Sequence, residues 1–251
     1  MRSICMLSAR MGGSRPCLYN CGEHCRMAGL HHKQRGSRAQ YLSLPGTSGN
    51  YASTVDSVAN SITGDIDIRV KVAMTDWTPA AGQVFVAKWT STGNQLAYRF
   101  GIAATGRPNF FYSAAGAVGT QRDATAATGF TDGTEHWVRT TVDVDDGAGN
   151  HVVKFYTSED GETWTQLGST VTTAGTISLF DSTAVVELGS IVVGTANLLV
   201  GKIYRAQIYN GIDGTLAVDF NAEDGVAGSG PLISRFTEET WTINGANAFL
   251  N

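Results

Sequence analysis

The eight residues DIDIRVKV at positions 65–72 decide the fold class of this chain. Apolar and charged side chains alternate strictly along them, which is the pattern of a β-strand with one face on a core and the other face in water. The predicted inward side chains are Ile66, Ile68, Val70 and Val72, and the predicted outward ones are Asp65, Asp67, Arg69 and Lys71. We expect the outward face to be solvated and ion-paired.

Similar runs follow at spacings of roughly 10–15 residues, with glycine, asparagine and aspartate between them. They lie at 83–89, 96–103, 109–113, 136–144, 151–158, 185–190, 202–210 and 215–220. No long helical period interrupts them, and 30 glycines with only 16% charged residues favour strands and tight turns. We therefore predict an all-β protein with an antiparallel β-sandwich of the jelly-roll type.

Two turns are legible in the middle of the chain. DVDDGAGN at 143–150 and SEDGETW at 158–164 contain the residues that tolerate a positive φ, so each predicts a hairpin. Residues 136–169 should then form a meander of three strands. We also expect TWTIN at 240–244 to return the C-terminus to the sheet near the first strand.

The net charge of −4 is unevenly distributed. Residues 1–38 hold seven basic residues and one acid, a net charge of +6, which leaves −10 for the remainder. This predicts two parts, a basic N-terminal arm (1–38) and a jelly-roll domain (39–251). A basic arm is attracted to acidic surfaces, so we expect it to anchor the protein. The anchoring residues are Arg2, Arg10, Arg15, Arg26, Lys33, Arg35 and Arg38.

Three of the four cysteines lie within the arm segment CLYNCGEHC (17–25). Cys17, Cys21, His24 and Cys25 have the residue types of a zinc site, yet on one unbroken helix they are too spread out to surround a single ion. A zinc site would need a broken helix or further ligands. Disulfides, small apolar packing residues, and a leader translated from an upstream start codon are the alternatives.

Neither a signal peptide nor a membrane segment is visible. The first residues lack the apolar run of a secretory signal, and no later stretch approaches about 18 uninterrupted apolar residues. We thus expect no membrane partner and no secretion by a signal peptide. Nucleic acid is disfavoured as a partner, because Tyr19 is the only aromatic residue in the arm.

Four segments of the body carry a family resemblance, and they include YLSLPGTSGNYAS (41–53), SITGDIDIRVKVAMTDWTP (61–79) and LVGKIYRAQIYNGIDGT (199–215). Together with 130–168, which holds HWVR and the hairpin FYTSEDGETWTQLG, they resemble the laminin-G-like jelly rolls of the concanavalin A-like superfamily. More narrowly, they are similar to domains in structural proteins of bacteriophages that infect actinobacteria. The resemblance covers about 39–220. It implies the jelly-roll fold and a place in a virion.

Catalysis is not expected from this sequence. Hydrolases of the superfamily place paired carboxylates on a strand face, and the nearest analogue here is Asp65 with Asp67, whose face continues with Arg69 and Lys71. No nucleophile signature accompanies His136 or His151. We predict a non-enzyme.

Two kinds of ligand site remain as expectations in the body. Sugar rings dock on exposed aromatic residues, and the candidates are Trp77, Trp89, Tyr98, Phe111 and Tyr112. The carboxylates of Asp143, Asp145 and Asp146 are a candidate calcium site, although the twelve-residue loop of an EF-hand is missing.

These observations predict a non-enzymatic bacteriophage virion protein, a minor tail or host-surface-binding protein that displays a lectin-like domain. Its expected partners are other virion proteins, in a symmetric multi-copy assembly, and host cell-wall polysaccharide. A capsid decoration protein of the same design is the alternative. A free carbohydrate-binding protein or a glycoside hydrolase is the rival from another class.

Overall fold

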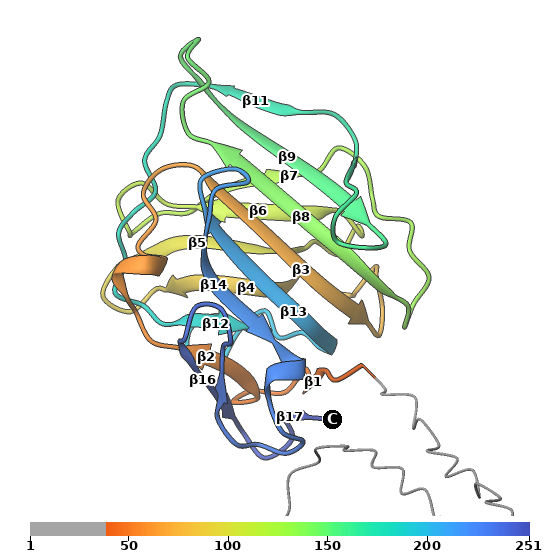
Figure 1. The fold of residues 1–251 in the computed structure, drawn as a ribbon. Coiled ribbons are helices and arrows are strands. Elements are labelled where there is room, and N and C mark those ends of the chain that lie inside the picture. Colours follow the sequence, from red (N-terminus) through yellow and green to blue (C-terminus); the bar gives the residue numbers. More distant parts are fainter. Residues whose placement is uncertain (1–38) are drawn as a thin grey trace, which may run out of the picture. The chain divides into compact units, whose positions relative to one another are not determined.

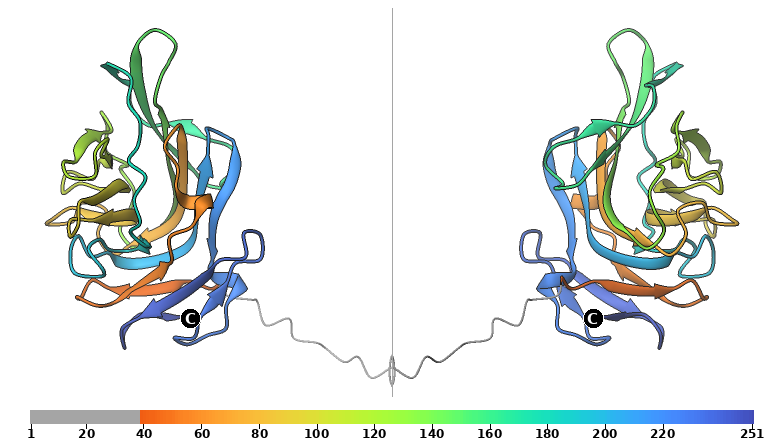
Figure 2. Two further views of the ribbon diagram at one scale, coloured as in Figure 1. Left: turned by 90° about the vertical axis from the view of Figure 1, so that its left-hand side faces the viewer. Right: turned by 90° about the vertical axis from the view of Figure 1, so that its right-hand side faces the viewer.

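The computed structural model describes residues 39–251, which form two antiparallel β-sheets packed face to face (Figures 1 and 2). In the described part, sheet A has the strand order β10-β9-β8-β3-β13-β1-β17, with β11 also paired to β9 and β14 also paired to β13. Its strands are β1 (Leu42–Pro45), β3 (Ile66–Met74), β8 (Glu135–Asp143), β9 (Asn150–Ser158), β10 (Thr165–Gln166), β11 (Val171–Ala174), β13 (Val200–Asn210), β14 (Thr215–Asn221) and β17 (Phe249–Leu250).

Sheet B has the order β15-β16-β2-β12-β4-β5-β6-β7. Its strands are β2 (Tyr51–Thr54), β4 (Gln83–Thr90), β5 (Gln95–Ile102), β6 (Pro108–Tyr112), β7 (Thr120–Asp123), β12 (Val186–Leu188), β15 (Leu232–Ile233) and β16 (Thr240–Asn244). Two single-turn 3₁₀ helices, Val58–Asn60 and Ala222–Asp224, complete the regular elements of the described residues. No helix in this part of the chain is long and apolar enough to cross a membrane.

The all-β antiparallel sandwich is therefore confirmed. Strand β3 covers the stretch that decided the fold class, and β8, β9 and β10 are consecutive neighbours in sheet A, as the predicted meander requires. The C-terminal prediction also holds. Strand β16 pairs with β2, and β17 pairs with β1, so the end of the chain returns to its first two strands.

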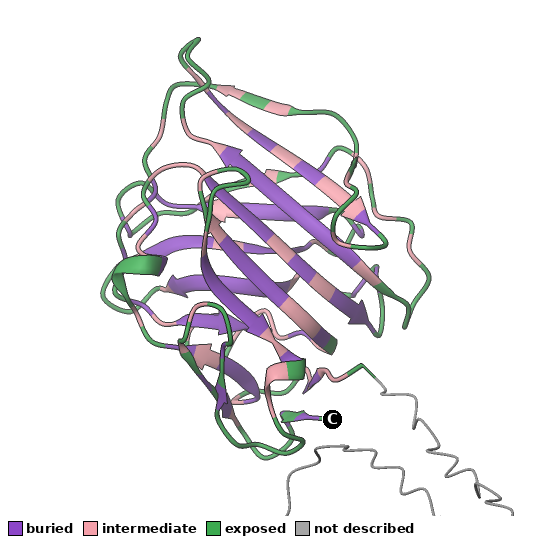
Figure 3. Ribbon diagram, in the orientation of Figure 1, coloured by how far each residue is buried: buried purple, intermediate pink, exposed green. Residues whose placement is uncertain are grey.

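Apolar side chains from both sheets fill the space between them. The buried residues are concentrated in the strands, and the connecting loops are largely exposed (Figure 3). One aromatic pair bridges the two layers: Phe100 of β5 faces Phe155 of β9, with ring centroids 6.5 Å apart. Within sheet B, Phe85 of β4 lies edge-on to Phe100 at 5.4 Å. The inward set predicted for residues 65–72 is completely buried in this core. Because strand side chains alternate, the other half of each strand points to the outer face of its sheet.

The outer face of β3 differs from the prediction in one respect. The face is ion-paired, as predicted, but at Asp67 it is closed to water. Asp67 is 0% exposed, and its carboxylate accepts hydrogen bonds from Arg69 (Nη2, 2.7 Å) and from Arg139 of β8 (Nη2, 2.7 Å). Both guanidiniums also bind Asp213 in the β13–β14 turn. The rings of Tyr209 and Trp164 lie over Arg69 and help to exclude water.

Candidate functional site

The outer face of sheet B carries an arginine that is held without a carboxylate partner in the described part of the chain. Arg99 of β5 stands in register with Phe111 of β6, and Phe111 stands in register with Gln121 of β7. The three side chains therefore form one row across neighbouring strands. Gly101 and Asn109 are paired next to them, two residues further along β5.

The guanidinium of Arg99 lies on aromatic rings. Its Cζ is 3.7 Å from the ring centroid of Phe111 and 5.2 Å from that of Trp89 in β4. Trp89 and Phe111 themselves meet edge to face at 6.2 Å. Such stacking holds a cation flat against the sheet and leaves its edge available for hydrogen bonds.

A single side chain in residues 39–251 accepts a hydrogen bond from this guanidinium. Arg99 Nη1 donates to Asn197 Oδ1 at 3.1 Å, while Nε is buried without an acceptor. Desolvation by burial lowers the pKa of Arg99 to about 10. No nearby carboxylate offsets that desolvation, so the site is a fixed positive charge with unused donor capacity.

A short loop between β12 and β13 supplies Asn197 and is held by a buried acid. Glu187 of β12 is 0% exposed, and its carboxylate accepts hydrogen bonds from Ser190 Oγ (2.7 Å), Val193 N (2.8 Å) and Gly194 N (2.8 Å). The backbone of Val193 has a φ of 54°, which is unfavourable for a β-branched residue. The Glu187 carboxylate thus compensates for a strained turn.

The same loop is also bound to the start of strand β4. Asn197 Nδ2 donates to Gly82 O at 3.0 Å, and the backbone carbonyl oxygen of Asn197 accepts from Val84 N at 2.9 Å. These two bonds hold Asn197 Oδ1 toward Arg99. The loop therefore acts as a wall beside the arginine.

These elements enclose a hollow of about 230 Å³ on the outer face of sheet B. It is lined by Gly82, Gln83, Val84, Arg99, Ile102, Ala103, Ala104, Asn109, Phe111, Gln121 and Asn197. Gly101 lets β5 approach β4 closely here, since a Cβ would lie 2.2 Å from Gln83 O. The side chain of Asn109, 8% exposed, makes no hydrogen bond within the described residues. No carboxylate lines the hollow. The acid paired next to Asn109 in β7, Asp123, accepts a hydrogen bond from Gln121 Nε2.

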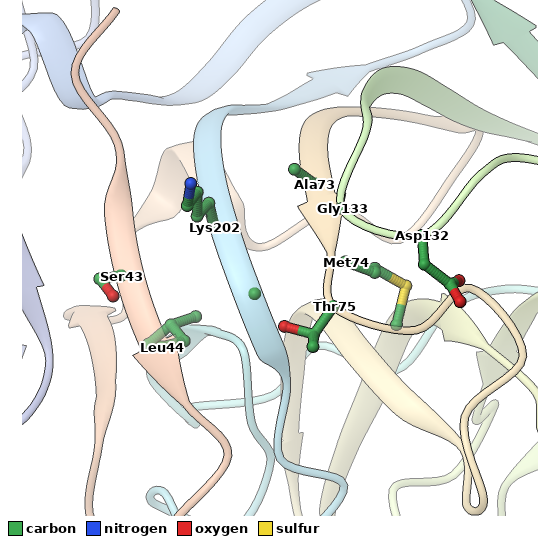
Figure 4. A pocket seen from close by; sticks show the side chains of 9 residues that line it. Ser43, Leu44, Ala73, Met74, Thr75, Asp132, Gly133 and Lys202 are labelled. Carbon is green, nitrogen blue, oxygen red and sulfur yellow. The ribbon is translucent and has the colours of Figure 1, made fainter.

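A second hollow, of about 360 Å³, lies where β1, β3 and β13 meet (Figure 4). The charged side chains of this second hollow, Asp132 and Lys202, already interact with other groups of the protein. The carboxylate of Asp132 accepts the backbone N–H of Trp77 at 2.8 Å, and the Lys202 ammonium lies over the ring of Tyr41 at 4.5 Å. The rest of its lining consists of small or apolar side chains and Ser43 and Thr75. The Arg99 hollow is therefore the better candidate for ligand recognition.

Most of the aromatic residues predicted to contact sugars do not reach a surface. Trp77, Tyr98 and Tyr112 are 1%, 0% and 4% exposed and pack in the core, so those three assignments are corrected. Trp89 is 7% exposed but lies beneath Arg99, and Phe111 lines the hollow. The aromatic candidates that belong to the site are thus the two on the outer face of sheet B.

Of the predicted metal ligands, the calcium candidates lie within the described residues and the zinc candidates lie outside them. Asp143 and Asp145 each accept a backbone N–H two residues on, and Asp146 caps the β8–β9 turn through Ala148 N and Asn150 N. Residues 39–251 contain no group of three acidic, histidine or cysteine side chains placed to share an ion. The zinc candidates and the anchoring residues lie outside the described residues; these are Cys17, Cys21, His24, Cys25, Arg2, Arg10, Arg15, Arg26, Lys33, Arg35 and Arg38.

Arg99, Asn109 and Asn197 were not singled out from the sequence. The available signal was the lone charge in LAYRFGI (96–102), a basic residue in an otherwise apolar strand. Asn197 had no local signal, because its role depends on a loop that Glu187 folds onto a strand distant in sequence.

Comparison with known proteins gives similarities of structure only. No protein-family model matches the chain, and no curated protein matches its sequence. A solved structure from Bacteroides ovatus, described as a "putative carbohydrate binding protein", superposes with a TM-score of 0.57 at 13% identity. The match covers 85% of this chain and 59% of that one, so this chain spans less than two thirds of its length.

Two further structures are similar at lower scores. A pentraxin from Limulus polyphemus has a TM-score of 0.47 at 13% identity, over 69% of this chain and 77% of that one. The CBM40 domain of a Ruminococcus gnavus sialidase, bound to α2,6-sialyllactose, has a TM-score of 0.46 at 20% identity, over 69% and 92%. At such identities the likeness is one of fold, and the chain has an antiparallel jelly-roll sandwich fold.

Proposed function

We propose that residues 39–251 form a non-enzymatic carbohydrate-binding domain, and that the saccharide binds in the Arg99 hollow of sheet B. One observation carries the proposal: a stacked arginine and an unengaged amide, Asn109, line a hollow with an aromatic floor. Saccharide sites combine an apolar ring surface with a few fixed polar groups, and both are present here. The Bacteroides ovatus protein of similar fold, described as carbohydrate binding, is consistent with the proposal.

The absence of catalysis is part of the same proposal. Asp67, one of the two carboxylates that form the nearest analogue of a catalytic pair, is buried between Arg69 and Arg139. Asp65 accepts the backbone N–H of Val144 at 2.8 Å. A general acid must hold a proton for its leaving group, and a carboxylate engaged by two guanidiniums is poorly suited to this role. Release of new reducing ends from cell-wall polysaccharide, lost in an Asp65→Asn/Asp67→Asn variant that still folds, would overturn this part.

A glycan array probed with the full chain tests the binding proposal, with calorimetry on the glycans that bind. Asn109→Ala removes an amide that has no described hydrogen bond, so it should weaken binding without unfolding the sheet. Gln207→Ala is the matched control. Gln207 lies on the outer face of sheet A, is also 8% exposed, and likewise has no described side-chain hydrogen bond. Equal affinity of both variants and the wild type for every bound glycan would place binding elsewhere.

The resemblance of the sequence to actinobacteriophage structural proteins supports a virion location for this domain. In that setting the arm anchors the chain to other virion proteins, and the domain presents its hollow to host cell-wall polysaccharide from the tail. Capsid decoration is the alternative location. Immunogold labelling of purified particles with an antibody to 39–251 separates the two, and particles that carry no label would contradict both.

A further inference from the structure

The charge of the Arg99 hollow indicates which class of saccharide it binds. Among residues 39–251, Arg99 forms no salt bridge, whereas the buried outer-face arginine of sheet A, Arg139, has two carboxylate partners. Both arginines lie on strands and stack on aromatic rings. The difference between them is that the negative charge expected beside Arg99 is not supplied by the described chain.

An unpaired guanidinium in such a place has an energetic cost. Burial removes water from the cation, and hydrogen bonds satisfy only part of its donor capacity. A buried donor without an acceptor is destabilising, and more so when the group is charged. Glu187, a buried acid on the same face, binds Ser190 and two backbone N–H groups instead. The loop therefore keeps this acid away from the arginine and uses the neutral Asn197 as the acceptor.

The remaining groups in the hollow also favour an acceptor-rich ligand. Apart from Arg99, the polar side chains that line the hollow are all amides: Gln83, Asn109, Gln121 and Asn197. The oxygens of Gln83 and Asn197 already accept hydrogen bonds, from Val200 N and from Arg99. A neutral sugar presents hydroxyl donors that need acceptors, and carboxylates usually provide them. The hollow has no carboxylate in its lining and offers mainly donors.

We infer that the Arg99 hollow selects acidic saccharides, with the anionic group of the sugar, a carboxylate or a sulfate ester, seated against the Arg99 guanidinium. This inference rests on the proposed carbohydrate binding and adds the class of ligand. Asp123 of β7 restricts where the anionic group of the sugar can lie. Its negative charge would repel an anion placed over β7, so the anion should lie over β5, where Arg99 is.

Acidic saccharides paired with neutral counterparts provide the test. The full chain is titrated with 3′-sialyllactose, lactose 3′-sulfate and lactose, and with tetragalacturonate and its methyl ester. We expect an acidic member to bind at least about tenfold more tightly than its neutral counterpart, a difference that corresponds to about 1.4 kcal/mol. The sialylated and sulfated probes distinguish a carboxylate from a sulfate as the preferred anion.

Three variants assign the preference to one side chain. Arg99→Gln should abolish the preference for the acidic member, and Arg99→Lys should retain part of it, because an ammonium keeps the charge without the planar fork. Lys154→Gln changes the net charge equally on the outer face of sheet A and should have no effect. Urea midpoints and circular dichroism confirm that each variant is folded.

The outcomes separate this inference from the proposal beneath it. Neutral and acidic members that bind equally well, or a preference unchanged in Arg99→Gln, would overturn the inference and leave carbohydrate binding intact. Binding of no acidic member would overturn it as well. Carbohydrate binding itself is then rejected only if the neutral glycans of the wider array also fail to bind.

Discussion

Replacing Asp67 by asparagine should destabilise the domain severely, because this carboxylate neutralises two arginines in a place that water does not reach. Asp67 is 0% exposed and accepts four guanidinium hydrogen bonds, at 3.3 and 2.7 Å from Arg69 and at 2.9 and 2.7 Å from Arg139. It also accepts Asp213 N at 3.2 Å. The asparagine would keep the volume but turn an NH₂ group toward these donors.

The expected magnitude follows from the burial of the partners. Removing one member of a buried ion pair costs about 3–5 kcal/mol, since the other charge is left uncompensated. The side chains of Arg139 and Arg69 are only 7% and 14% exposed, but Asp213 still accepts from both guanidiniums and reduces the loss. We therefore expect Asp67→Asn to lower the free energy of unfolding by about 3 kcal/mol.

Urea unfolding of the full chain, followed by fluorescence, measures this loss. With an m value of about 3 kcal/mol/M, the midpoint should fall by about 1 M. Asp213→Asn is the control, because that side chain is 66% exposed and exposed ion pairs contribute about 0–1 kcal/mol. If Asp67→Asn shifted the midpoint no more than Asp213→Asn, the outer face of sheet A would be effectively solvated, and the reasoning from burial would be wrong.

Three further predictions concern other polar groups. Lys88→Met should lower the free energy of unfolding, measured in urea, by about 3 kcal/mol, because the ammonium is completely buried and donates to Asp56 at 2.6 Å. A loss below about 1 kcal/mol would show that Asp56 becomes hydrated freely when Lys88 is removed. Backbone N–H groups, chiefly that of Thr163, lower the pKa of the Asp160 carboxyl in the folded protein. The ionised Asp160 therefore stabilises the fold fully above its ordinary pKa of about 3.9, and this stabilisation is lost as the pH falls through the lower pKa of the folded state. The difference in urea midpoint between wild type and Asp160→Asn should then shrink below about pH 4, and a difference independent of pH would contradict this. Glu187→Gln should weaken glycan binding as well as stability, since it loosens the loop that holds Asn197, and unchanged affinity in calorimetry would show that the loop wall is unimportant.

The fold was predictable because its signal is local. Alternation along 65–72 and the Asp-Gly turn at 160–161 report on side-chain direction and on positive φ, and neither depends on distant residues. Several short strands escaped notice for the same reason. Strands such as β7 and β15 have too few residues for a period and are defined by their pairing partners.

The site was less predictable because its properties arise from contacts between distant segments. Arg99 in sequence is one charge in an apolar strand, and only the structure shows that it lies on Phe111 and is bound by Asn197. Three of the five aromatic candidates were misplaced for a different reason. A β-strand presents alternate faces, and sequence alone did not reveal that Tyr98 and Tyr112 face the core while Phe111 faces outward.

The pairing of β1 with β17 brings residues from the start and the end of the domain within one hydrogen bond of each other. Asn251 N donates to Tyr41 O at 3.0 Å, and Leu42 stands in register with Leu250. A domain whose two ends are neighbours can be inserted into a surface loop of another protein with little separation of the flanking chain. We therefore expect residues 41–251 to tolerate insertion between two residues of a carrier protein, and circular permutation through a short peptide that joins Tyr41 to Asn251.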